Sequence, residues 1–144
     1  MIWTLIQVAF GGAIGSALRY LTVVSIGAPL GTIAVNVLGS FVMGVLFATI
    51  SARTSIAPFL MTGILGGFTT FSAFSLDTLL LWESGQPVEA AAYVAFSVFL
   101  SLAAVAVGVA LARGAEAAVE MHLERGGLGE LVGRQRGAAL VEVV

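Results

Sequence analysis

The chain has 144 residues, 59% of them hydrophobic and 10% charged, with a mean hydropathy of +1.08 and a formal net charge of −2. These values lie far from those of soluble domains and indicate an integral membrane protein, with the lipid bilayer as its surroundings. The chain has no cysteine and one histidine, which excludes disulfides and thiolate or histidine-rich metal sites, and its slight acidity excludes a basic surface for nucleic acid.

Charged residues are rare enough to mark the ends of membrane-spanning helices, because a hydrocarbon core about 30 Å thick takes roughly 20 apolar residues to cross as helix. The first segment lacks the basic start and cleavage site of a signal peptide, so we interpret it as a spanning helix. We predict an all-α integral membrane protein with four transmembrane helices, at about residues 2–24, 30–51, 57–82 and 88–112. They form a channel domain over 1–113, followed by a polar tail, partly helical or disordered, over 114–144, to which we assign no chemistry.

The arginines give almost no preference for one orientation in the membrane. With four crossings, Arg53 and Arg113 lie on the side of the termini, and Arg19 lies towards the other side. Such a chain could insert in both orientations, which would permit an antiparallel homodimer. Alternatively, the arginines of the tail decide the orientation, and the residues by themselves leave the two alternatives equal.

The first two helices carry small and polar residues in helical register. The segment GGAIG, Gly11 to Gly15, predicts close packing against another helix. In the second helix, Thr32, Asn36 and Ser40 are spaced at i,i+4 and share one face. The amide of Asn36 could join helices by a hydrogen bond, or it could donate to an anion.

The third helix contains the segment around which the rest is organised, GILGGFTTFSAFSLD at 63–77. We expect the third helix to be broken at membrane depth over Gly66 to Thr70, with Gly66 and Gly67 supplying the break. Such a break frees backbone groups that only protein or a water-filled path can satisfy. Such a break is typical of an ion or substrate site. Hydroxyls and aromatic rings surround it, namely Thr69, Thr70, Ser72, Ser75, Phe68, Phe71 and Phe74. Asp77 could lie at depth or equally near the end of this helix.

In the fourth helix, Tyr93, Ser97 and Ser101 form a ladder of hydroxyls at i, i+4 and i+8. Serines also bond back to their own helix, and Tyr93 could belong to an aromatic belt at the interface. Facing a broken helix, however, the ladder is what a dehydrating ion path needs. The positive ring edges of Phe71 and Phe74 could supplement these donors around a small anion.

The chain has no nucleotide-binding loop, paired catalytic carboxylates or metal cluster, so we predict that it is not an enzyme. Three other classes of function compete. An ion channel is favoured by the polar path. A proton-coupled small-molecule exporter of the small dual-topology class would use Asp77, although the first two helices have no acid to support it. A membrane scaffold, in which the glycines only pack helices, would carry no flux.

Four stretches together resemble the Fluc/CrcB fluoride channel family, over about residues 11–113: GGAIGSALRY, GTIAVNVLGS, GGFTTFSAFSLD and the Tyr-Ser-Ser ladder. The resemblance implies an antiparallel, dual-topology homodimer in a bacterial plasma or inner membrane. Its two pores would export cytoplasmic fluoride passively and selectively, lowering fluoride toxicity.

The same resemblance implies roles for single residues. By motif, Asn36 and Thr32 resemble pore residues of the second helix, and Phe71 and Phe74 resemble the family's phenylalanine box. Tyr93, Ser97 and Ser101 resemble the family's polar track, and Thr70 and Ser72 take pore positions. A vestibule or gating role is implied for Arg19 and Asp77. The backbone carbonyls of Gly66 and Thr69 would bind one structural Na+ at the dimer centre. Ala73 and Asp77 depart from the threonine and glutamate that are common in the family.

Overall fold

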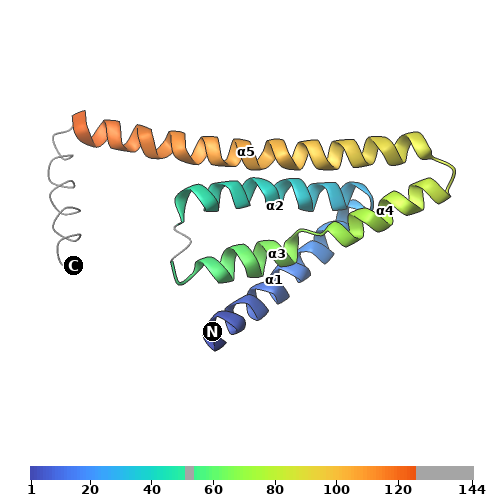
Figure 1. Cartoon of the computed structure of the whole chain (residues 1–144), viewed down its shortest axis with the longest axis horizontal. Coiled ribbons are helices and arrows are strands. Elements are labelled where there is room, and N and C mark those ends of the chain that lie inside the picture. The colour runs from blue at the N-terminus through green and yellow to red at the C-terminus, as the bar shows by residue number, and fades with distance from the viewer. Residues whose placement is uncertain (51–53, 126–144) are drawn as a thin grey trace.

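The structure is a computed structural model that describes residues 1–50 and 54–125 (Figure 1). Within them the chain is helical throughout, in the order α1 (Ile2–Ile26), α2 (Leu30–Thr49), the π-helix η1 (Pro58–Leu65), α3 (Gly66–Phe68), α4 (Phe71–Glu83) and α5 (Pro87–Arg125). Four stretches are long and apolar enough to cross a bilayer: α1, α2, Pro58–Glu83 and α5. The four predicted spans are therefore confirmed, and the chain is a multi-pass membrane protein.

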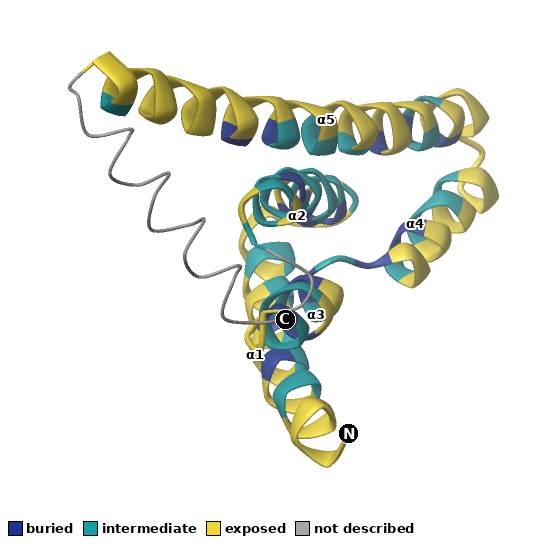
Figure 2. Cartoon of the chain, turned by 60° about the vertical axis from the view of Figure 1, so that its left-hand side comes forward, coloured by how far each residue is buried: buried dark blue, intermediate teal, exposed yellow. Residues whose placement is uncertain are grey.

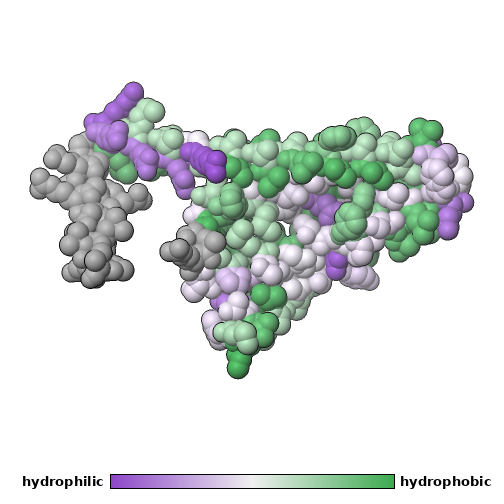
Figure 3. Space-filling view, viewed as in Figure 1, coloured by the Kyte–Doolittle hydropathy of each residue, from purple (hydrophilic) through white to green (hydrophobic). Residues whose placement is uncertain are grey.

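The helices pack as two pairs, α2 with α5 and α1 with the first part of the third span. In Figure 1, α2 lies along α5, and α1 lies against the η1 and α3 part of the third span, while α4 continues to the turn before α5. Buried residues line the facing sides of these pairs, and the outer sides are exposed (Figure 2). The exposed surface along most of α5 is apolar (Figure 3), as expected for a surface that contacts lipid.

Glycines allow the backbones to approach closely in both pairs. A Cβ added at Gly11 would lie 2.9 Å from Gly63 Cα, so only glycine permits this contact between α1 and η1. In the other pair, a Cβ at Gly44 of α2 would lie 3.1 Å from the carbonyl carbon of Val105 in α5. The GGAIG segment is thus a packing surface, as its sequence predicts.

The third span leaves helical geometry at two threonines. Thr69 (φ −83°, ψ 155°) and Thr70 (φ −152°, ψ 122°) are extended, whereas Gly66 (φ −63°, ψ −35°) and Gly67 are helical. The interruption therefore lies within the predicted range 66–70, but at its two threonines and not at Gly66 and Gly67. The physical reason is that Thr70 is the N-cap of α4, accepting a hydrogen bond from Ala73 N at 3.2 Å, and a capping residue has an extended backbone. Gly67 instead allows close contact with α1, since a Cβ there would lie 2.6 Å from the Gly12 carbonyl oxygen.

The fourth span continues well beyond its predicted end at residue 112. With 39 residues, α5 is about 58 Å long, which exceeds the hydrocarbon thickness. Its last part, after Arg113, carries the exposed acids Glu116, Glu120 and Glu124 and is the hydrophilic end seen in Figure 3. The first part of the predicted tail is thus a continuation of this helix, and its remainder, 126–144, lies outside the described residues, as does Arg53.

Candidate functional site

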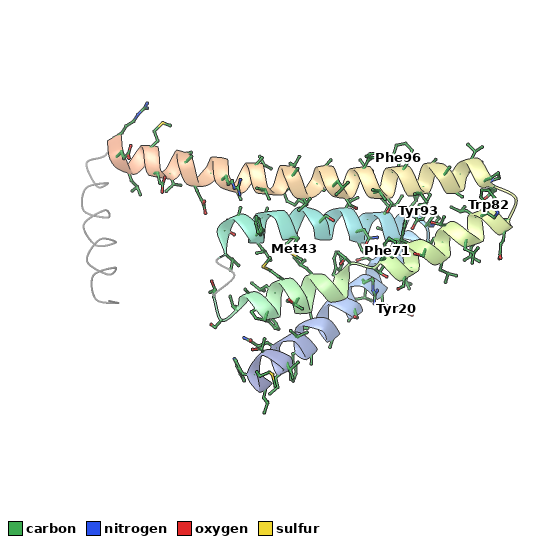
Figure 4. All side chains as sticks on the ribbon, viewed as in Figure 1. Tyr20, Met43, Phe71, Trp82, Tyr93 and Phe96 are labelled. Atoms are coloured by element: carbon green, nitrogen blue, oxygen red, sulfur yellow. The ribbon has the colours of Figure 1, made fainter. Side chains whose placement is uncertain are left out.

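A cavity of about 380 Å³ lies between α2, the extended threonines and α5. Its polar lining comes from Asn36, Ser40, Thr69, Thr70, Ser97 and Ser101, and its apolar lining includes Phe71, Phe74 and Met43. In Figure 4, Tyr93 and Met43 lie on the inner side of the helices, whereas Phe96 points away from α2. The cavity therefore brings together polar residues predicted from three different helices.

Asn36 holds the backbone where the third span leaves helical geometry. Its Nδ2 donates to the Thr70 carbonyl oxygen at 3.0 Å, and its Oδ1 accepts from Thr70 N at 2.7 Å. Both backbone groups of an extended, buried residue are satisfied in this way. The amide has two N–H groups, and the second has no partner among the described residues. Asn36 therefore joins two helices and still has one donor for a ligand, so its two proposed roles are compatible.

Asp77 is half-buried and lies between α2, α4 and α5, beside the start of α2. Thr32 Oγ1 donates to Asp77 Oδ2 at 2.6 Å, and Tyr93 Oη donates to the same oxygen at 3.2 Å. Thr32 is 1% exposed and Tyr93 is 5% exposed, which excludes an interfacial aromatic belt for Tyr93. The hydroxyl hydrogens of both residues are used by the carboxylate, and neither residue lines the large cavity. Asp77 instead lines a second cavity, of about 170 Å³, beside Ala28 and Pro29.

The two serines of the ladder behave differently from other hydroxyls in the spans. Thr22, Thr49 and Thr78 each bond back to the carbonyl four residues earlier. Ser97 and Ser101 form no hydrogen bond with the described residues, and Ser101 Oγ is buried without a partner. Back-bonding is therefore excluded for these two serines, and their hydroxyls are free to bind a ligand in the cavity.

Three aromatic rings follow one another from the surface inwards. The ring centroids of Phe71 and Phe74 are 5.3 Å apart, and those of Phe74 and Tyr93 are 5.4 Å apart. Phe74 is 8% exposed, whereas Phe71 is 78% exposed at the rim of the cavity. Within one chain, then, the outer ring of the predicted phenylalanine box has no cover.

The two carbonyls predicted to bind sodium have lost their usual helical donors. The Gly66 carbonyl would accept from Thr70 N in a continuous helix, but that group donates to Asn36. The Thr69 carbonyl would accept from Ala73 N, which donates to Thr70 Oγ1 instead. Backbone carbonyls without donors suit a hard cation, so the residues present are compatible with Na+. Within the described residues, no group of His, Cys, Asp and Glu side chains could hold a metal ion.

The remaining predicted residues lie around this site. Ser72 Oγ is 3.2 Å from Thr70 Oγ1 at the start of α4. Arg19 is half-buried near the end of α1 and does not line the cavity. Ser40 does line it, although the sequence interpretation left it out of the pore. Its i,i+4 spacing from Asn36 was the available signal.

Comparisons with known proteins agree on one family. The family described as "CrcB-like protein, Camphor Resistance (CrcB)" matches residues 6–109. The "Fluoride-specific ion channel FluC" of Cereibacter sphaeroides is 55% identical over 123 residues, covering 79% of this chain and 98% of that protein. The proteins of the same name from Paracoccus denitrificans and Rhizobium johnstonii are both 52% identical, over 118 and 119 residues. They cover 77% and 75% of this chain, and the matches span 95% and 94% of those proteins.

Proposed function

The chain belongs to the CrcB-like family, which confirms the resemblance seen in its sequence, and on that premise we propose that it is a fluoride-selective ion channel. In this proposal an antiparallel homodimer exports cytoplasmic fluoride passively through two pores in a bacterial cell membrane. The family is one of ion channels and not of enzymes.

The observation that carries the proposal is a cavity, open at the Phe71 side, whose donors are not used by the protein. Ser97, Ser101 and the second N–H of Asn36 line it and have no partner among the described residues. Fluoride is small and strongly hydrated, so a narrow path must replace its water with short hydrogen bonds from protein donors. Hydrogen bonds to an anion are about twice as strong as neutral ones. These donors supply a site for a small anion, and the names of the relatives identify it as fluoride.

The homodimer is supported by the exposure of Phe71. A ring that is 78% exposed beside the cavity is covered if a second copy packs against this face. Its partly positive edge then faces the ion. In a dimer, the Gly66 and Thr69 carbonyls of both copies, four in all, would surround one Na+. This ion would satisfy oxygens that lack helical donors. The small charge bias across the membrane is compatible with two opposite orientations.

The exporter alternative gains no support. Asp77 accepts hydrogen bonds from Thr32 and Tyr93, and the relatives are named as channels. Passive transport needs no titrating group in the path.

The test is anion efflux from liposomes that contain the purified protein, followed with a fluoride electrode and, in parallel, a chloride electrode. We expect rapid fluoride efflux with little chloride efflux, a loss of about tenfold for Ser97→Ala, and none for Ser25→Ala, which removes an exposed hydroxyl of α1. No fluoride efflux from a folded dimer, or equal efflux of both anions, would overturn the proposal.

A further inference from the structure

Ser40 is a polar residue of the large cavity to which the family resemblance gives no role. It lines the cavity from α2, and its hydroxyl forms no hydrogen bond with the described residues. We propose that Ser40 and Ser101 together form an additional binding level for the permeating anion. This inference rests on the proposed function and deepens it.

The relative placement of α2 and α5 puts the two serines towards the same end of the cavity. At one end, Thr32 and Tyr93 both donate to one oxygen of Asp77. At the other end, Gly44 lies between Val105 and Val109, since a Cβ at Gly44 would lie 3.1 Å from both the Val105 carbonyl carbon and Val109 N, so α2 and α5 run in the same direction. Helices that run side by side both rise about 1.5 Å per residue. Between the two ends, Ser40 lies one helical turn beyond Asn36, and Ser101 lies one turn beyond Ser97, so both serines line the cavity towards the Gly44 and Val105 end.

Ser40 and Ser101 have hydroxyl donors, but the described residues around them offer no acceptor for these hydroxyls. Ser101 Oγ is buried without a partner, and a buried polar group without a hydrogen bond is costly. The neighbouring lining residues Met43, Leu102 and Val105 are apolar and offer no side-chain acceptor. A partner from outside the chain would satisfy both hydroxyls, and an anion can accept from two donors at once.

The spacing suits an ion that moves in steps. Four residues separate Asn36 from Ser40 on α2 and Ser97 from Ser101 on α5, which corresponds to about 6 Å along each helix. Conduction requires several sites that bind weakly enough to release the ion. The structure assigns Ser40 as the α2 donor of the second of these sites.

The test measures fluoride efflux for wild type, Ser40→Ala, Ser101→Ala and the double variant, with Ser25→Ala as the control for loss of an exposed hydroxyl. Dimer formation is checked by gel filtration. We expect Ser40→Ala to lower efflux about tenfold, the effect of one hydrogen bond to an ion. If both serines bind one ion, their two losses are not independent. The fluoride efflux rate of the double variant should then be about equal to that of the slower single variant.

The outcomes separate the inference from the proposed function. Wild-type protein without fluoride efflux refutes the proposed function. Wild-type efflux with an unchanged Ser40→Ala variant, or a double variant slowed by the product of the two single effects, refutes the shared site. If Ser40→Ala does not form the dimer, Ser40→Thr and Ser40→Val replace it. These side chains have the same shape, so equal efflux from both refutes a role for the hydroxyl, and faster efflux from Ser40→Thr supports it.

Discussion

Replacing Asn36 tests the contact that holds the extended part of the third span. Asn36→Leu keeps a side chain of similar volume but removes both hydrogen bonds to Thr70, of 3.0 Å and 2.7 Å. Thr70 is buried, so its N–H and C=O would stay unsatisfied at about 1–3 kcal/mol each. We expect a loss of about 2–6 kcal/mol in the free energy of unfolding, measured by denaturant titration in detergent.

Asn36→Asp separates the two bonds. The carboxylate still accepts from Thr70 N, but its other oxygen cannot donate to the Thr70 carbonyl and repels it, so the expected loss is at least that of the one missing bond, about 1–3 kcal/mol. Its negative charge also faces the anion path, and we expect fluoride efflux to be abolished while the dimer remains. Thr49→Val is the control, since it removes a hydroxyl that bonds back within α2. A stability of Asn36→Leu within about 0.5 kcal/mol of wild type would refute the reasoning.

Three further predictions concern packing, the aromatic rings and proton coupling. Gly15→Ala destabilises the protein by about 1–3 kcal/mol in thermal unfolding, because a Cβ at Gly15 would lie 2.8 Å from Phe68 N, whereas Gly12→Ala has no atom within 4 Å to meet and is neutral. Phe71→Ile abolishes fluoride efflux with little loss of stability within the chain, whereas Phe74→Ile also lowers stability by about 1 kcal/mol through its lost ring contacts. Asp77→Asn retains passive efflux within about tenfold of wild type and shows no dependence on a pH gradient, since an amide oxygen still accepts from its two hydroxyl donors.

Each of these has an outcome that contradicts it. Equal melting temperatures for the Gly15 and Gly12 variants would show that α1 does not pack by close backbone contact. Full fluoride efflux in Phe71→Ile would remove the exposed ring from the pore. Flux that is driven by a pH gradient in wild type and lost in Asp77→Asn would favour the exporter.

Hydrophobic length and motif order were enough to predict the membrane class, four spans and the family. Span length is a local property, because the hydrocarbon core sets the number of apolar residues that a helix needs. The second span, predicted at about 30–51, corresponds to α2 at Leu30–Thr49. The continuation of α5 beyond residue 112 was not predictable, since past the bilayer the helix runs on through charged residues whose hydropathy gives no sign of it.

The sequence by itself determined which polar residues share a helix face, but only the tertiary structure decided what each one bonds to. Spacing placed Thr32, Asn36 and Ser40 together, yet Thr32 bonds to Asp77 of α4, Asn36 bonds to the backbone of Thr70, and Ser40 lines the cavity without a hydrogen bond to the described residues. The same holds for the interruption of the third span. Local preference assigned it to Gly66 and Gly67, whereas in the structure it lies at the threonines, where Asn36 bonds to the backbone of Thr70. Periodicity is fixed by the geometry of one helix, whereas a hydrogen bond between helices depends on their packing distance and register, which no single segment encodes.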